Sequence, residues 1–295
     1  MVPVLWLIAS LTFVLLRIIP GGPFDAEKRL PPEVVANLKA KYHLDQPLST
    51  QYIIYMRRLA SGDLGVSYKY VDRSVNEILA DAFPVSLALG SLALLIATVF
   101  GITLGTIAAV NRGTWIDTVA MFFSTVGVSV PGFVIGAVLI FIFGIWLKVL
   151  PVALWESPLH LILPAVTLAF SPAAYLARLT RASVLEAIEK DWVRTARSKG
   201  LPYSQTILKH VLRNAFVPIA TVLGPLTAIL ITGSFSVEYI YAIPGMGRFF
   251  ITAVQNRDYD LVIATTLIFA VLLVIANAIV DVVYLYLDPR MQVEG

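Results

Sequence analysis

Long apolar stretches are the feature that most limits what this chain can fold into. A helix that crosses the hydrocarbon core of a bilayer needs about 20 mostly apolar residues. Six stretches approach or exceed that length, at residues 2–19, 85–110, 118–147, 159–177, 215–237 and 261–284. Only 14% of the residues are charged and the mean hydropathy is +0.82, which excludes an ordinary soluble domain. We therefore expect an all-α integral membrane protein with six transmembrane helices.

The first and third stretches are each open to a second interpretation. A signal peptide would have a basic start, but here Arg17 follows the apolar run, so we expect a retained helix. The stretch 118–147 is long enough for one tilted helix or for a helix that continues beyond the bilayer. Prolines do not argue against these helices, because neighbouring helices can satisfy the freed carbonyls. The prolines concerned are Pro131, Pro164, Pro172, Pro218 and Pro225.

The placement of charge sets the expected orientation. Residues 178–213 carry eight Lys/Arg and three Asp/Glu beside two span ends, so the positive-inside rule places them in the cytoplasm. Residues 20–84, with balanced charges, then lie outside, and both termini are cytoplasmic. Asp281 lies near the cytoplasmic end of the last span. We expect it to pair with a basic residue such as Arg178 or Arg181, or to face water, because an isolated charge in a bilayer is costly.

The segment between the first two spans is expected to be a small helical insertion outside the membrane. Helices are predicted over residues 30–44 and 49–60, and Ser74-Val-Asn-Glu77 is a capping box that opens a short helix before Pro84. The insertion is interpreted as a helical cap on the bundle or as a docking surface for an external partner. The expected domains are residues 1–83, the first helix with this insertion, and residues 84–295, a five-helix core.

The chain has no recognisable catalytic motif. It contains no cysteine, and its three histidines lie far apart, so thiol chemistry and a metal pair at helical spacing are excluded. A P-loop, a GxSxG motif and an HExxH motif are all absent from the sequence. We expect a protein that is not an enzyme and holds no cofactor. The second outside loop carries four charged residues, which are expected to be ordinary solvated charges, with a gate or docking surface as the alternative; these are Arg248, Arg257, Asp258 and Asp260.

A basic amphipathic segment at about residues 184–216 is the most informative part of the chain. One apolar stripe runs along an expected first helix and repeats in a second. Its members are Val184, Leu185, Ile188, Trp192, Val193 and Ala196, then Ile207, Leu208, Val211, Leu212, Ala215 and Phe216. Gly200 and Pro202 end the first helix, and Ser204 is expected to cap the second. We call this segment the elbow.

Three functions are considered for the elbow. The first is a basic loop that only sets topology and touches lipid headgroups. The second is a nucleic-acid site, and the third is a coupling element that docks on a cytosolic motor subunit. A nucleic-acid site does not fit a membrane fold. A helical elbow that is rigidly joined to two spans transmits motion, which favours the coupling element.

The elbow resembles the loop motif of ABC-importer permeases, Glu-Ala-Ala-x-x-x-Gly followed by Ile-x-Leu-Pro. Ala196, Gly200 and Leu212 match that pattern, whereas Arg194-Thr195 replaces the Glu-Ala pair. Other stretches are similar to the first permease subunit of the peptide and nickel branch, and PPEVVAN and KYHLDQP resemble its oligopeptide permeases. These stretches are RIIPGGPF, LPPEVVANLKAKYHLDQP, GDLGVSY, GSFSVEYIYAIPGMGRFF, NRDYDLV and NAIVDVVYLYLDPR.

The resemblance implies a type I ABC-importer permease fold and a multi-pass location in the bacterial inner membrane. It implies a second homologous permease, two cytosolic ABC ATPases that hold ATP and Mg, and an extracytoplasmic binding protein that delivers the peptide substrate. Membrane lipid surrounds the spans. The ATPase contact is then expected at Asp191, Arg194, Thr195, Ala196, Lys199, Gly200, Leu201 and Pro202. The alternatives are a dipeptide or nickel permease of the same branch and, from another class, an ion-coupled secondary transporter.

Overall fold

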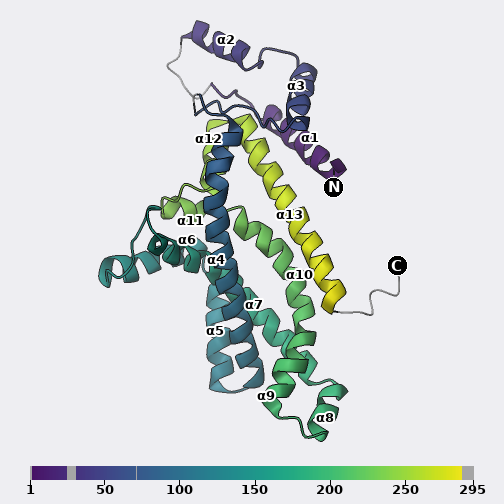
Figure 1. Ribbon diagram of the computed structural model, residues 1–295. Coiled ribbons are helices and arrows are strands. Elements are labelled where there is room, and N and C mark those ends of the chain that lie inside the picture. Colours follow the sequence, from purple (N-terminus) through teal and green to yellow (C-terminus); the bar gives the residue numbers. More distant parts are fainter. Residues whose placement is uncertain (1, 25–30, 71, 288–295) are drawn as a thin grey trace. The chain divides into compact units, whose positions relative to one another are not determined.

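The computed structural model describes residues 2–24, 31–70 and 72–287 (Figure 1). Its regular elements in these ranges are helices, with one isolated bridge between Val66 and Ser74. The chain forms two compact units. The insertion unit comprises Met1–Val85 and Pro244–Val271, and the core unit comprises Ser86–Ile243 and Leu272–Gly295.

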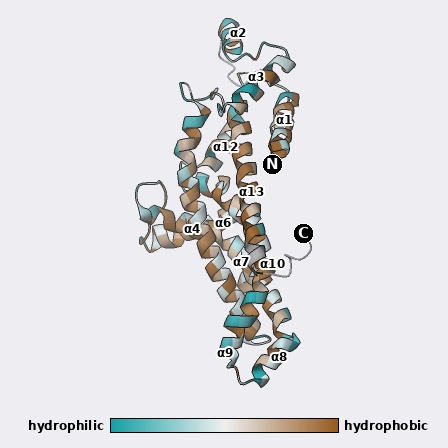
Figure 2. Ribbon diagram, turned by 45° about the vertical axis from the view of Figure 1, so that its right-hand side comes forward, coloured by the Kyte–Doolittle hydropathy of each residue, from teal (hydrophilic) through white to brown (hydrophobic). Residues whose placement is uncertain are grey.

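Four helical segments among the described residues are long and apolar enough to cross a membrane. They contain α4 (Val75–Val110), α7 (Ile162–Ile188), α10 (Leu212–Ile231) and α13 (Tyr259–Leu287). Figure 2 shows hydrophobic residues along each of them. The bent pair formed by Trp115–Ser129 and Gly132–Trp146 makes a fifth span if it is counted as one. Helix α1 (Val2–Ile18) is apolar but shorter, at 17 residues, so the six expected spans are matched only in part.

The prediction of one helix over residues 118–147 is wrong. The structure breaks it by 109° between α5 (Trp115–Ser129) and α6 (Gly132–Leu139), and a π-helix over Ile140–Trp146 follows. The cause lies at Val130, whose extended backbone (φ −85°, ψ 127°) is the conformation favoured before Pro131. Other prolines behave as expected, since α7 and α10 continue through Pro172, Pro218 and Pro225.

The insertion unit contains the expected short helices, α2 (Pro32–Lys41) and α3 (Leu48–Ala60). The capping box is confirmed, because the Ser74 amide donates to Glu77 at 3.0 Å and the Glu77 amide donates to Ser74 Oγ at 3.2 Å. However, the helix that it opens is α4, which runs for 36 residues through Pro84, so the prediction of a short helix is wrong. Its first turns pack on α12 (Met246–Asn256) and on the start of α13.

Two acids that we expected to be solvated are buried in the insertion unit. Asp258 is fully buried and accepts a hydrogen bond from the Ser67 hydroxyl, and Asp260, 9% exposed, accepts one from the Val66 amide at 3.3 Å. The turn between α12 and α13 is left-handed at Arg257 (φ 55°), and the two acids follow it directly. Burial raises the pKa of Asp258, because the charged carboxylate is desolvated.

The core unit is held together by close helix packing. A cluster of buried side chains joins α4, α7 and α10; it contains Ala93, Ala97, Ala169, Leu176 and Ile219. Small residues allow the backbones to approach, as is typical of helix pairs in membranes. Helix α11 (Phe235–Ile240) adds the buried Glu238, which accepts a hydrogen bond from Ser86 at 2.9 Å.

Candidate coupling site

The elbow connects α7 to α10 through α8 (Asp191–Ser198), a single turn α9 (Tyr203–Gln205) and a π-helix over Thr206–Val211. The expected continuous helix from residue 184 to the glycine is wrong, because α7 ends at Ile188. Lys190 adopts an extended backbone (φ −74°, ψ 148°) and starts α8 afresh.

The turn after α8 is set by Gly200, as expected. Its φ of +84° lies in the left-handed region, where a side chain is disfavoured. The Gly200 amide donates to the Arg197 carbonyl at 2.9 Å and the Leu201 amide donates to the Ala196 carbonyl at 3.3 Å. This pair of bonds is the Schellman end of a helix. The cap of the next helix was mispredicted, because Pro202 occupies that position instead of Ser204.

The inner side of the elbow is a packed apolar cluster, which confirms the predicted stripe. Its fully buried members come from both arms and from the end of α4; they are Ala109, Val184, Ala187, Val193, Ile207, Val211 and Ala215. Leu208 is the exception, since it is 66% exposed. Burial of this stripe stabilises the packing of the two arms against each other.

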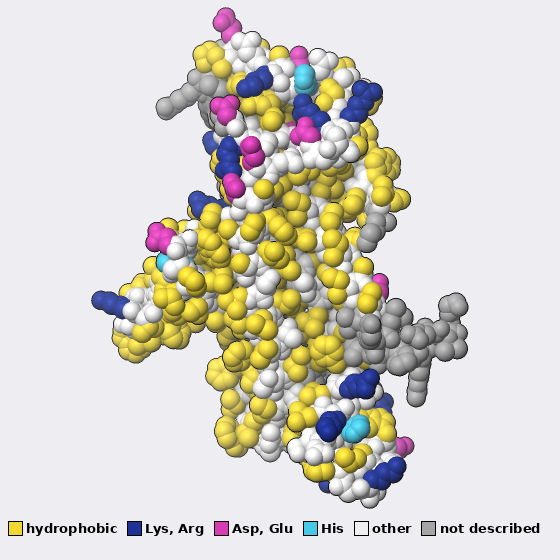
Figure 3. All heavy atoms as spheres, viewed as in Figure 1, with side chains coloured by type: hydrophobic (Ala, Val, Ile, Leu, Met, Phe, Trp, Pro, Cys, Tyr) yellow, Lys and Arg dark blue, Asp and Glu magenta, His cyan; other side chains and the backbone are white. Residues whose placement is uncertain are grey.

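The outer side of the elbow carries the residues predicted for ATPase contact. Ala196 and Leu201 are half-buried, and the remaining six are exposed; these are Asp191, Arg194, Thr195, Lys199, Gly200 and Pro202. All eight lie between the start of α8 and the start of α9. Figure 3 shows Lys and Arg side chains gathered at the end of the core unit that carries α8 and α9. This surface is basic and lies over the apolar cluster.

A second set of charges beside the elbow was not predicted from the sequence. Arg181 of α7 forms a two-pronged ion pair with Asp117 of α5, with N–O distances of 2.6 and 2.7 Å. The expected pairing of Arg181 with Asp281 is therefore wrong, and Asp281 is exposed. The pair joins residues 64 positions apart, and no local pattern reveals such a contact.

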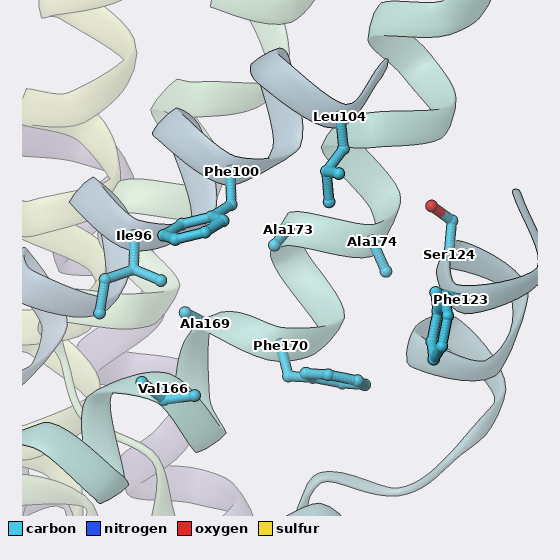
Figure 4. A pocket seen from close by; sticks show the side chains of 10 residues that line it. All are labelled: Ile96, Phe100, Leu104, Phe123, Ser124, Val166, Ala169, Phe170, Ala173 and Ala174. Atoms are coloured by element: carbon cyan, nitrogen blue, oxygen red, sulfur yellow. The ribbon is translucent and has the colours of Figure 1, made fainter. Parts of the chain in front are cut away.

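A cavity of about 320 Å³ lies between α4, α5 and α7 (Figure 4). Phe100, Phe123 and Phe170 project into it, and alanines of α7 form part of its wall. Ser124 brings the only hydroxyl among its lining side chains, and this hydroxyl already donates to the Ala120 carbonyl at 2.9 Å. The lining offers apolar contact and no charged group.

Comparisons with known proteins agree with this architecture. Residues 101–293 match the family model described as "Binding-protein-dependent transport system inner membrane component". The chain is 46% identical over 97% of its length to the "Dipeptide transport system permease protein DppB" of Bacillus subtilis, covering 92% of that protein. It is 44% identical over 98% of its length to the "Oligopeptide transport system permease protein OppB" of Haemophilus influenzae, covering 95% of that protein.

Solved structures show the same fold at low sequence identity. A chain from "Crystal structure of an amino acid ABC transporter with histidines" matches 70% of this chain and 92% of its own length, with a TM-score of 0.54 and 19% identity. A chain of the MetNI methionine ABC transporter in inward-facing conformations matches 70% and 96%, with a TM-score of 0.55 and 17% identity. The family match covers more than half of the sequence, and the two relatives extend over nearly all of it. The chain thus belongs to the family of binding-protein-dependent transport system inner membrane components: it is a multi-pass subunit of an inner-membrane transporter and not an enzyme.

Proposed function

We propose that this chain forms half of the transmembrane pathway of an ATP-driven importer of short peptides. The observation that carries the proposal is identity of 46% and 44%, over nearly the whole chain, to proteins named as dipeptide and oligopeptide permeases. The two values are too close to separate these substrates. Oligopeptides are our first choice, because the insertion words PPEVVAN and KYHLDQP resemble oligopeptide permeases.

The proposed assembly follows from membership in a binding-protein-dependent family. It contains this chain, a second homologous permease, two cytosolic ATPases that bind ATP and Mg, and an extracytoplasmic binding protein. Six spans are proposed, with α1, α4, the bent α5–α6 pair, α7, α10 and α13 as the crossing segments. The elbow and both termini are then cytoplasmic, residues 1–83 contain the first span and the outside insertion, and residues 84–295 form the permease core.

The elbow is proposed as the element that couples the ATPases to the spans. Its exposed basic surface is available to a cytosolic partner, and its apolar cluster joins that surface to α7 and α10. Because a packed cluster resists deformation, a push on α8 is carried into two membrane helices. The contact residues are the eight predicted ones, from Asp191 to Pro202.

The test replaces Gly200 by valine and compares it with the same change at Gly62. Both glycines have a left-handed φ, +84° and +80°, and a Cβ at either position meets nothing within 4 Å. The local backbone strain is therefore similar, about 1–2 kcal/mol, but only Gly200 lies in the elbow. We expect Gly200→Val to abolish ATP-dependent uptake of a labelled oligopeptide in cells, and Gly62→Val to retain it. Normal uptake by a stably expressed Gly200→Val variant would refute the coupling role.

A further inference from the structure

Helices α4 and α5 pack closely on α7, which leads into the elbow, and the Asp117–Arg181 pair joins α5 to α7. We propose that Arg181 and Asp117 are positioning residues for transport, which make the α4–α5 hairpin follow the elbow when it moves. This inference rests on the proposed coupling function of the elbow and adds the route by which motion spreads.

The pair is built for orientation. Arg181 Nε donates to Asp117 Oδ1 at 2.6 Å, and its second nitrogen donates to Oδ2 at 2.7 Å. The Gly113 amide, in the α4–α5 turn, also donates to Asp117 Oδ2 at 3.0 Å. The Asp117 side chain is only 6% exposed, and both of its carboxylate oxygens accept hydrogen bonds. A two-pronged Arg–carboxylate pair fixes the angle between its partners as well as their distance.

Helices α4 and α5 also contact α7 closely at two glycines. A Cβ added at Gly127 of α5 lies 2.6 Å from the Ala174 Cβ, and one added at Gly105 of α4 lies 2.6 Å from the Thr180 Cβ. Both contacts are tighter than ordinary carbon–carbon separations of about 3.5–4.0 Å, so these helices already lie as close as glycine permits. Packing of this kind opposes closer approach. The ion pair adds a directional contact that resists separation and rotation of the two helices.

The route is continuous with the elbow. Arg181 lies three residues before Val184, which is buried in the elbow cluster, and Ala109 of α4 belongs to the same cluster. At the surface, Arg112 of the α4–α5 turn pairs at 3.0 Å with Glu189, one of the two residues between α7 and α8. This outer pair is exposed and contributes little by itself. Because Asp117 is buried, we expect the loss of its pair with Arg181 to loosen the hairpin more than the loss of the outer pair.

The experiment uses the complete transporter in proteoliposomes and measures two rates, ATP hydrolysis stimulated by peptide-loaded binding protein and peptide uptake. The variant is Arg181→Met, and its matched control is Arg178→Met, an exposed arginine three residues earlier on the same helix. We expect Arg181→Met to assemble and to hydrolyse ATP. The number of peptides imported per ATP should fall by about 5-fold or more, and 5-fold is the low end of typical coupling effects. Arg178→Met keeps the wild-type ratio.

Conservative replacement separates positioning from folding. Arg181→Lys keeps the charge but loses the two-pronged geometry, so we expect an assembled complex with an intermediate ratio. A wild-type ratio in Arg181→Met or Arg181→Lys overturns the inference, and so does a failure of both variants to assemble. Gly200→Val distinguishes the two proposals: if it too keeps the wild-type ratio, the coupling role of the elbow itself is refuted.

Discussion

The approach of α4 to α7 gives a prediction that is worked out directly from the structure. Gly105 of α4 faces α7 so closely that an added Cβ contacts the Ala177 carbonyl oxygen and lies 2.6 Å from the Thr180 Cβ. Because ordinary carbon–carbon contacts begin near 3.5 Å, the helices must move apart by about 1 Å to accept an alanine. Extra volume in a well-packed core costs about 1–3 kcal/mol.

The change to test is Gly105→Ala, with Gly132→Ala as its control. A Cβ at Gly132 meets nothing within 4 Å, and neither glycine has a left-handed φ. Gly105 lies inside α4, where alanine favours a helix over glycine by roughly 0.5–1 kcal/mol, whereas Gly132 is the first residue of α6 and gains less from alanine. This preference offsets part of the overpacking, so we expect Gly105→Ala to be about 0.5–2 kcal/mol less stable than Gly132→Ala, or roughly 2–30-fold in the unfolding equilibrium constant.

The assay is reversible unfolding of the detergent-solubilised chain by sodium dodecyl sulfate, followed by tryptophan fluorescence. The protein has five tryptophans and no cysteine, so the signal is intrinsic and oxidation does not interfere. Equal stability of the two variants would refute the close approach of α4 and α7. It would also remove the packing on which the proposed link between the α4–α5 hairpin and α7 rests.

Three further predictions test other parts of the account. Ser74→Ala removes the acceptor for the Glu77 amide, and we expect a loss of about 1 kcal/mol in unfolding free energy. Burial raises the pKa of Asp258, so its contribution to stability is complete below the unfolded pKa of about 3.9 and is lost as pH rises through the folded pKa. Between these two pKa values, the free energy of unfolding therefore falls less with rising pH in Asp258→Asn than in the exposed control Asp45→Asn. An equal pH dependence of the two variants would contradict the burial. Asn37→Cys is expected to react with an impermeant maleimide only from outside, and labelling only from the cytoplasm would invert the proposed topology.

Local sequence patterns predicted the features that depend on local chemistry. The capping box at Ser74, the glycine turn at Gly200 and the apolar stripe of the elbow are each determined by residues a few positions apart. The position of the ATPase-contact residues along the chain was expected from the resemblance to ABC-importer permeases. Their contact with an ATPase stays a prediction.

The features that were missed depend on which residues meet in three dimensions. Pro131 ends α5, but Pro172 lies inside α7, and sequence alone does not say which proline has neighbours that support its helix. Likewise, Asp258 was expected in solvent because charged residues in loops usually are, but the turn after α12 places it against Ser67. The Asp117–Arg181 pair is a third case, since its partners are brought together only by the packing of α5 on α7.

The most direct test of the central claim is peptide uptake by proteoliposomes that contain the complete transporter and its peptide-loaded binding protein. The energy source is varied between internal ATP and an imposed proton or sodium gradient. We expect a labelled oligopeptide to accumulate only with hydrolysable ATP on the side of the elbow, and collapse of the ion gradients to leave the rate unchanged. Accumulation that follows an ion gradient without ATP would contradict the account.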